Sequence, residues 1–302
     1  MKVRDVFFHE IYKKTKQGED IVIVSSDIGA PSLDDFRRDF PNRFINVGIA
    51  EQNLLAVSSG LQLAGKKVVA YALNPFPVTR AFDQVRNIMA SLQIPLTVTA
   101  LNAGTCSAEA GYTHMPIENI SMVRTLKNLQ VVNPSDETIA KRLAHAVVEE
   151  PYPRYVQFDK YIEGELYAER DIDFQTGFIT NGKEGKVAVV AYGTMAHGLM
   201  GLGLPVKVID CYCLPVQEEK FVQEIEGCSQ IVTVEDGVVE GGIGSMVLEL
   251  LNDRGMQIPV ARKGLRFQKG YPNVFTNREM LWQEEGLALS GLEQEIKELC
   301  GG

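Results

Sequence analysis

The chain has 302 residues, of which 45% are hydrophobic and 23% are charged, and its formal net charge is -9 at pH 7. These proportions provide enough apolar material for two ordinary cores and exclude a largely disordered chain. The acidic balance argues against nucleic acid as the main partner, because phosphate backbones are bound by basic faces. No apolar stretch is long enough to cross a bilayer and the first residues form no signal peptide, so we expect no membrane partner and a cytoplasmic location. The five scattered cysteines are odd in number, which favours free thiols.

Strands and helices alternate along the first half of the chain, which is typical of a largely parallel sheet covered on both faces. Short apolar runs predict buried strands, and 3.6-residue periodicity predicts the helices between them. Ser135 is a candidate cap for the last of these helices. The expected strands cover residues 21–24, 67–72, 95–100, 130–133 and 154–158, and the expected helices cover residues 6–14, 80–92 and 135–149.

The second half repeats this alternation after a polar, irregular stretch. We therefore expect an α/β protein of two consecutive doubly wound, mostly parallel-sheet domains, at residues 1–165 and 186–302, joined by a linker at 166–185. Only a short helix fits between Gly193-Thr194 and Pro205. The other expected elements are strands at 187–191, 206–210 and 230–234, and helices at 216–225 and 244–251.

One acid stands at a junction between a strand and a helix. Residues 43–53 predict a short strand that runs into a helix, and Glu51 lies in the first turn of that helix, which ends before Gly65. Open α/β sheets place ligands beside strand ends, so a carboxylate here can face a bound molecule. The alternative is that Glu51 only complements the helix dipole, as acids in first turns commonly do.

Three ordered motifs decide between these interpretations. The chain carries Val-Gly-Ile-Ala-Glu-Gln-Asn at 47–53, Thr-Arg-Ala-Phe-Asp-Gln-Val-Arg at 79–86 and Gly-Tyr-Thr-His-Met-Pro-Ile-Glu at 111–118. A later segment combines Val-Thr-Val-Glu-Asp at 232–236 with Gly-Gly-Ile-Gly-Ser at 241–245. Over nearly its whole length the chain thus resembles the second half of the transketolase family, the pyrimidine-binding domain followed by the C-terminal domain. This resemblance implies a thiamine diphosphate protein that lacks the family's first half.

The resemblance also implies roles for individual residues around the cofactor. In the family, the glutamate at the position of Glu51 hydrogen-bonds the aminopyrimidine ring of thiamine diphosphate and favours the tautomer that activates the coenzyme. Ile49 and Gln52, in the same motif, and Asp27 are assigned to this cofactor site, although Asp27 could simply form a turn. Phe76 is the candidate to stack on the ring, with an ordinary core position as the alternative.

Substrate contacts follow from the same resemblance. His114 is expected to act on the substrate carbonyl or hydroxyl by hydrogen bonding or proton transfer, and a purely structural histidine is the alternative. Arg4, Ser32 and Lys160 match the family's phosphate contacts, or else are solvated surface residues. Asn102 falls among the substrate contacts, and Glu118 is expected only to tie the His114 loop to the following helix.

The sequence departs from the family pattern at several site positions. Asn74 and Pro77 occupy the places where an aromatic ring is usual, and Lys160 replaces an arginine. Asn102 and Ala110 stand where many sugar-transferring members have histidine and aspartate. We therefore expect hydroxyl recognition to differ, so the substrate need not be a standard pentose phosphate.

The family's magnesium motif, Gly-Asp-Gly followed by Asn, is absent from the sequence. We therefore expect no metal in this chain, and we expect a partner subunit, the N-terminal half of a transketolase, to bind the diphosphate and magnesium in an α2β2 heterotetramer. The predicted activity is that of a split transketolase moving a two-carbon ketol unit from a phosphorylated or otherwise anionic ketose to an aldose. The alternatives are a 2-oxo acid dehydrogenase beta-type subunit, a synthase of the 1-deoxyxylulose-5-phosphate type, or a noncatalytic regulatory subunit.

Overall fold

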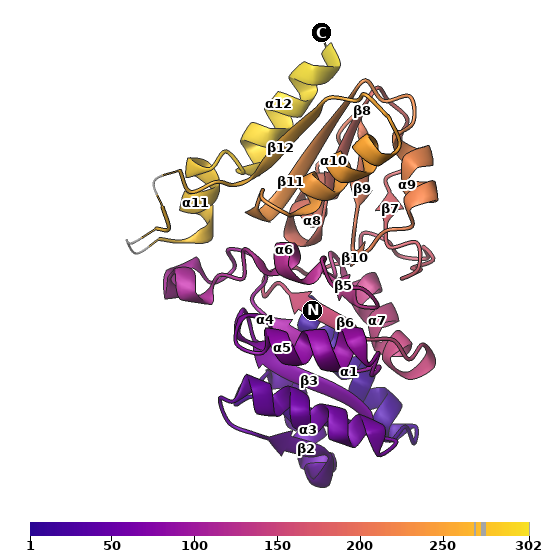
Figure 1. The fold of residues 1–302 in the computed structure, drawn as a ribbon, viewed down its shortest axis with the longest axis vertical. Coiled ribbons are helices and arrows are strands. Elements are labelled where there is room, and N and C mark those ends of the chain that lie inside the picture. Colours follow the sequence, from indigo (N-terminus) through magenta and orange to yellow (C-terminus); the bar gives the residue numbers. More distant parts are fainter. Residues whose placement is uncertain (269, 273–275, 302) are drawn as a thin grey trace. The chain divides into compact units, whose positions relative to one another are not determined.

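The computed structural model of the protein describes residues 1–268, 270–272 and 276–301. The chain forms two compact units. The first contains residues 1–103 and 123–170, and the second contains residues 104–122 and the chain from residue 171 onward. Each unit has a sheet flanked by helices (Figure 1), which confirms the expected class of two doubly wound, mostly parallel α/β folds. Segment 104–122 groups with the second unit, and the domain boundaries drawn from the sequence stay a prediction.

The sheet of the first unit is parallel and has the strand order β5-β6-β4-β3-β1-β2. Its strands are apolar runs buried on both faces, as expected for a covered parallel sheet. The chain builds β2 on one side of β1 and β3 on the other, so the carboxyl ends of β1 and β3 form a topological switch point, where such sheets bind ligands. The strands are β1 (Ile21–Ser25), β2 (Phe44–Asn46), β3 (Lys67–Leu73), β4 (Thr97–Leu101), β5 (Gln130–Val132) and β6 (Arg154–Phe158).

Helices cover both faces of this sheet (Figure 1). The helix expected over 80–92 is present only over 82–91, and most of it is π-helical. Arg80 instead ends a short helix, because its amide donates to the Phe76 carbonyl, and the chain then passes through one short helix into a π-helical segment, Val85–Ser91. The helices are α1 (Val3–Lys16), α2 (Asp34–Asp39), α3 (Glu51–Leu63), α4 (Phe76–Thr79), α5 (Phe82–Gln84) and α7 (Glu137–Glu149).

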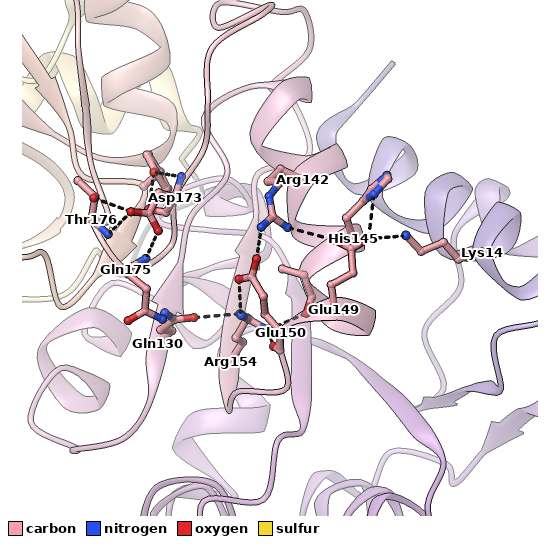
Figure 2. Close-up of polar contacts among 12 residues, drawn as sticks. Lys14, Gln130, Arg142, His145, Glu149, Glu150, Arg154, Asp173, Gln175 and Thr176 are labelled. Atoms are coloured by element: carbon pink, nitrogen blue, oxygen red, sulfur yellow. Dashed lines mark hydrogen bonds and ion pairs between the residues drawn. The ribbon is translucent and has the colours of Figure 1, made fainter.

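Both ends of α7 are closed by side chains. The expected cap Ser135 is wrong: Asp136 is the N-cap, since its carboxylate accepts a hydrogen bond from the Ile139 amide at 2.8 Å. At the other end the buried guanidinium of Arg154 donates to the carbonyls of Ala146 (3.2 Å) and Glu150 (2.7 Å) (Figure 2). The Ala146 carbonyl also accepts from the Glu150 amide at 2.9 Å, so the buried cation adds a second donor there and supplies a donor to the Glu150 carbonyl just beyond the helix.

The sheet of the second unit has the order β12-β11-β8-β9-β7, and only β7 runs antiparallel to its neighbour among these strands. The switch point lies between β8 and β11. The segment predicted as a linker contains β7, which pairs with β9. The strands of this sheet are β7 (Ile179–Thr180), β8 (Val187–Ala191), β9 (Lys207–Asp210), β11 (Gln230–Val238) and β12 (Val260–Leu265). The short strand β10 (Cys213–Leu214) lies outside it.

Helices flank this second sheet (Figure 1). The short helix expected after Gly193 is present as α8, and α12 packs against it. Segment 104–122 belongs to the same core, because Met115 and Ile117 are buried in one cluster with Val189 and Val234. The helices are α8 (Gly193–Gly201), α9 (Glu218–Ile225), α10 (Ile243–Asp253), α11 (Arg278–Glu284) and α12 (Leu289–Gly301), with a short α6 (Asn119–Val123) at the end of the inserted segment.

Two further expectations concern the cysteines and the membrane. All five cysteines are free thiols, as expected, and four of them are buried. Within the described part of the chain, no helix combines the length and the apolar character needed to cross a bilayer.

Candidate active site

Glu51 is the first residue of α3, after β2 has ended at the edge of the first sheet. A tight turn brings the chain to the helix, with Gly48 at φ +75° and its carbonyl accepting from the Ala50 amide at 2.8 Å. The Ala50 side chain cannot cap the helix, so the amides of the first turn remain directed at the region around Glu51. The Glu51 side chain is only 3% exposed. A buried carboxylate in this position requires a partner.

That partner is Arg80, which sequence reasoning did not single out. Its Nη1 lies 3.1 Å from Glu51 Oε2, and its guanidinium stacks 3.8 Å from the centre of the Phe76 ring. Arg80 is 49% exposed, so one face of the pair meets solvent. The signal for Arg80 was its place in the 79–86 motif, directly after the short helix that carries Phe76. Glu51, Arg80 and Phe76 therefore form one cluster in which a ligand nitrogen can replace the half-exposed arginine at the carboxylate.

The two neighbours of Glu51 in its motif differ in environment. Gln52 donates from Nε2 to the Arg80 carbonyl at 3.1 Å, which ties the start of α3 to the end of α4. Ile49 is 73% exposed, although it lies two residues before the buried acid. The structure thus leaves Ile49 accessible to a ligand or to another chain.

Asp27 follows β1 at the switch point and is held by Asn46. It has φ +57°, and its carboxylate accepts from Asn46 Nδ2 at 2.8 Å while its amide donates to Asn46 Oδ1 at 3.1 Å. The same Asn46 oxygen accepts from the Gly48 amide at 2.9 Å. Asn46 therefore links the turn of Asp27 to the approach of Glu51. Sequence reasoning missed Asn46, whose only signal was a polar residue ending a short strand.

Two residues after β3, Asn74 and Pro77, depart from the aromatic residues usual in the family. Asn74 is fully buried, and its side-chain oxygen accepts from the Tyr155 hydroxyl at 2.5 Å. Pro77 is also buried, in the first turn of α4. Neither residue presents a side chain to solvent, whereas Phe76 is partly exposed and faces Arg80. Among the described residues of this stretch, Phe76 is the aromatic group at the end of β3.

The predicted phosphate contacts lie near the start of α1. Arg4 donates to both carboxylate oxygens of Asp5, at 2.9 and 3.1 Å, and Ser32 Oγ donates to the same carboxylate at 2.8 Å. The structure therefore joins Arg4 and Ser32 through an acid that the sequence analysis had not considered. Arg4 is already paired, so an anion reaching it must compete with Asp5.

Lys160 and Asn102 follow the ends of β6 and β4. The ammonium of Lys160 lies 5.1 Å above the Tyr161 ring. The next residues run beside the start of α1, where the Val3 amide donates to the Ile162 carbonyl at 3.1 Å. Asn102 is buried at φ +75°, and its amide donates to the Phe158 carbonyl at 2.9 Å. These contacts place both residues at the carboxyl edge of the first sheet.

His114 lies in the second compact unit, whereas Glu51 lies in the first. Its ring nitrogen Nδ1 is 3.0 Å from Thr113 Oγ1, and its amide donates to the Gly111 carbonyl at 3.0 Å. Glu118 accepts from the Tyr271 hydroxyl at 2.6 Å, and its expected tie to the following helix stays a prediction. Tyr112 stacks on Tyr271 with ring centres 5.3 Å apart.

The acids of the 232–236 motif are occupied by protein donors. Glu235 is buried and accepts from the amides of Ile243 (3.0 Å) and Gly244 (3.2 Å) at the start of α10. Asp236 accepts hydrogen bonds from Thr105 and Trp282. Within the described ranges, no group of three or more histidine, cysteine or acidic residues is placed to hold a metal ion.

The comparisons with known proteins agree with this arrangement. Residues 1–161 match the pyrimidine binding domain of transketolase, and residues 179–274 match the transketolase C-terminal domain. The chain is 28% identical to one of the subunits of the apulose-4-phosphate transketolase of Actinobacillus succinogenes, covering 86% of this chain and 87% of that protein. It is 29% identical to 1-deoxy-D-xylulose-5-phosphate synthase of Caldanaerobacter subterraneus, covering 98% of this chain but only 49% of that enzyme.

A solved structure described as a split gene transketolase, inactive beta4 tetramer, has a TM-score of 0.81 and 29% identity. The match covers 99% of this chain and 97% of that one. Fold, motif positions and family matches coincide over both units. The chain therefore belongs to the transketolase family and comprises its pyrimidine-binding and C-terminal domains.

Proposed function

We propose that this chain is the pyrimidine-binding subunit of a split, thiamine diphosphate-dependent transketolase. The enzyme transfers a two-carbon ketol unit from a phosphorylated or otherwise anionic ketose to an aldose. The observation that carries this proposal is Glu51, a buried carboxylate that follows the edge strand β2 and pairs with Arg80, a half-exposed arginine beyond the end of β3. Such a carboxylate can exchange its partner for a ring nitrogen of the coenzyme.

The residues around Glu51 fit the aminopyrimidine end of the coenzyme. The carboxylate hydrogen-bonds the ring and holds a proton at its nitrogen, while Phe76 supplies an aromatic face. Ile49 and Gln52 would border the ring, and Asp27 would face the coenzyme from the end of β1. When bound, thiamine diphosphate supplies the carbon nucleophile and the electron sink for cleavage of the carbon–carbon bond.

Substrate binding is assigned to the residues that match the family's substrate contacts. The phosphate of the substrate is contacted by Arg4, Ser32 and Lys160, and a hydroxyl of the substrate is contacted by Asn102. His114 hydrogen-bonds or moves a proton at the substrate oxygen. Asp5 offsets one of the two positive charges, so the site favours a single anionic group over a highly charged substrate.

A separate chain, the N-terminal half of a transketolase, completes the enzyme by binding the diphosphate and magnesium. Support comes from relatives that are each named as one subunit of a transketolase. The solved relative of the same length is named as an inactive tetramer of one subunit type. We propose an α2β2 heterotetramer acting in the cytoplasm on small sugars.

Reconstitution tests this assignment. The purified chain should show little ketol transfer alone, and adding its N-terminal-half partner with magnesium and thiamine diphosphate should restore activity. Size-exclusion chromatography with light scattering gives the stoichiometry of the complex, and a partner-free sample with both cofactors is the control. Full activity from the lone chain would contradict the split-enzyme proposal.

The second candidate is a decarboxylating synthase, favoured by the similarity to 1-deoxy-D-xylulose-5-phosphate synthases of roughly twice this length. Measuring carbon dioxide released from pyruvate and other 2-oxo acids by the assembled complex separates this chemistry, and that of a 2-oxo acid dehydrogenase, from ketol transfer. Binding of thiamine diphosphate without turnover of any substrate would instead indicate a noncatalytic regulatory subunit.

A further inference from the structure

Asp236 occupies the switch point of the second sheet. It lies near the end of β11, next to β8, where open α/β sheets commonly receive a ligand. Here the chain fills that position with its own segment 104–122, whose Met115 and Ile117 side chains are buried in the core of this unit. The second switch point therefore holds the loop that carries His114.

The Asp236 carboxylate joins this loop to α11. Oδ1 accepts from Thr105 Oγ1 at 2.7 Å and from Trp282 Nε1 at 2.9 Å. Oδ2 accepts from the Thr105 amide at 3.0 Å and lies 3.4 Å from Arg278 Nη2. Each oxygen thus connects one donor of the loop with one donor of the helix. Because Asp236 and Arg278 are both buried, these charge-assisted bonds are strong and directional.

Gly104 allows the loop to approach Asp236 this closely. Its φ is +52°, and a Cβ atom added at this position would lie 2.3 Å from Asp236 Oδ2 and 2.5 Å from the Asp236 carbonyl oxygen. Only glycine fits both the left-handed backbone and the contact. The close approach is therefore built into the sequence of the loop.

A continuous series of turns connects Thr105 to His114. The Ala108 amide donates to the Thr105 carbonyl at 3.1 Å, the Gly111 amide to the Ala108 carbonyl at 2.9 Å, and the His114 amide to the Gly111 carbonyl at 3.0 Å. With a bond every third residue, a displacement of Thr105 is passed along the backbone to His114. The position of the imidazole thus depends on the residue that fixes Thr105.

We infer that Asp236 is a positioning residue for His114, acting through Thr105. Beyond the histidine the loop is held again by β11, since the Val238 amide donates to the Ile117 carbonyl at 3.0 Å. The second unit therefore contributes to catalysis by fixing the backbone that carries the substrate-facing imidazole of His114. This inference rests on the proposed role of His114 in ketol transfer.

The geometric part is tested on the full chain by hydrogen exchange. Thr105→Val removes the hydroxyl bond to Asp236, and the amides of Ala108, Gly111 and His114 should exchange about tenfold faster. Thr233→Val is the matched control, because Thr233 is equally buried on the same strand as Asp236 and its hydroxyl has no hydrogen-bond partner among the described residues. Unchanged exchange in Thr105→Val, or faster exchange throughout the unit, would overturn the inference.

The catalytic part is tested in the reconstituted enzyme. Thr105→Val should lower kcat/KM for the sugar by about 10- to 100-fold, while the Kd for thiamine diphosphate changes less than about twofold. In a His114→Ala background the same substitution should cost less than about twofold, because the group that it displaces is gone. An equal loss in both backgrounds would show that Thr105 does not act through His114.

A second variant covers the case in which Thr105→Val folds poorly. Asp236→Asn keeps the side-chain volume but weakens the bonds to Thr105 in the loop and the bonds to α11. It should therefore accelerate amide exchange in the loop and shift the fluorescence emission of Trp282, the single tryptophan. Thr105→Val should leave that emission unchanged, because it alters only the loop side. If no variant of the assembled enzyme shows ketol transfer, the proposed function fails, and the exchange results still decide whether Asp236 fixes the loop.

Discussion

Replacing Glu51 with glutamine separates catalytic from structural roles of this acid. Glu51→Gln keeps the side-chain volume and removes the negative charge, so the carboxylate can no longer hold a proton at the ring of the coenzyme. We expect kcat of the reconstituted enzyme to fall by about 10²- to 10⁴-fold, the range for loss of a positioned acid or base. This corresponds to about 3 to 5 kcal/mol of transition-state stabilisation.

The same substitution should leave the folded chain nearly as stable as before. Removing one partner of a fully buried ion pair commonly costs about 3 to 5 kcal/mol, because the other charge is left buried. Here the remaining charge belongs to Arg80, which is 49% exposed, whereas the lost carboxylate was only 3% exposed. Arg80 can be hydrated and the desolvation of Glu51 disappears, so we expect the free energy of unfolding to change by less than about 1 kcal/mol.

Urea unfolding of the isolated chain measures stability, steady-state kinetics of the complex measure kcat, and calorimetry measures cofactor binding. Glu235→Gln provides the contrast in stability, because the buried Glu235 carboxylate accepts two amides at the start of α10. We expect this control to lose about 1 to 3 kcal/mol. A Glu51→Gln enzyme with a rate near that of the wild type, or a chain destabilised by about 3 kcal/mol, would refute this account of Glu51.

Two further predictions concern the scaffold. Arg154→Met should lower the free energy of unfolding by about 3 to 5 kcal/mol, since it deprives the end of α7 and the Gln130 side chain of a buried donor (Figure 2). Arg142→Met is the control, because it removes a partly exposed ion pair and should cost less than about 1 kcal/mol. Equal losses of the two variants in urea unfolding would contradict this difference. Burial alone would raise the pKa of Asp173, but hydrogen bonds from the hydroxyl and amide of Thr176 and from the amide of Gln175 hold that pKa below its ordinary value of 3.8. The deprotonated form is therefore favoured in the folded state. The difference in free energy of unfolding between the wild type and Asp173→Asn should be largest near neutral pH and should shrink as the pH falls below about 4. A difference that stays constant down to about pH 3 would contradict the expectation.

Local patterns in the sequence were sufficient for most of the strands and for the position of Glu51. The apolar runs that became β1, β3 and β6 need only neighbouring residues to show their burial, and the junction before Glu51 combines a strand pattern with a helix pattern. Predictions failed where several local solutions compete. Ser135 and Asp136 are both good caps, and the packing of the following residues selected Asp136, whose second carboxylate oxygen accepts the amides of Leu166 and Tyr167.

The residues missed by sequence reasoning act over long distances in the chain. Asn46 holds Asp27, Arg80 pairs with Glu51, and Thr105 bonds to Asp236, which lies 131 residues away. Periodicity reports which face of an element is buried, but it carries no information about which distant element covers that face.

The sequence by itself therefore determined the class of the fold, the family and the acid at the start of α3, because these depend on short-range patterns and on ordered motifs. Only the tertiary structure decided that Asp5 stands between Arg4 and Ser32, and that the loop of His114 is fixed by the C-terminal unit. The reason is that hydrogen bonds between distant segments depend on the order of the strands in the two sheets, which short-range patterns do not encode.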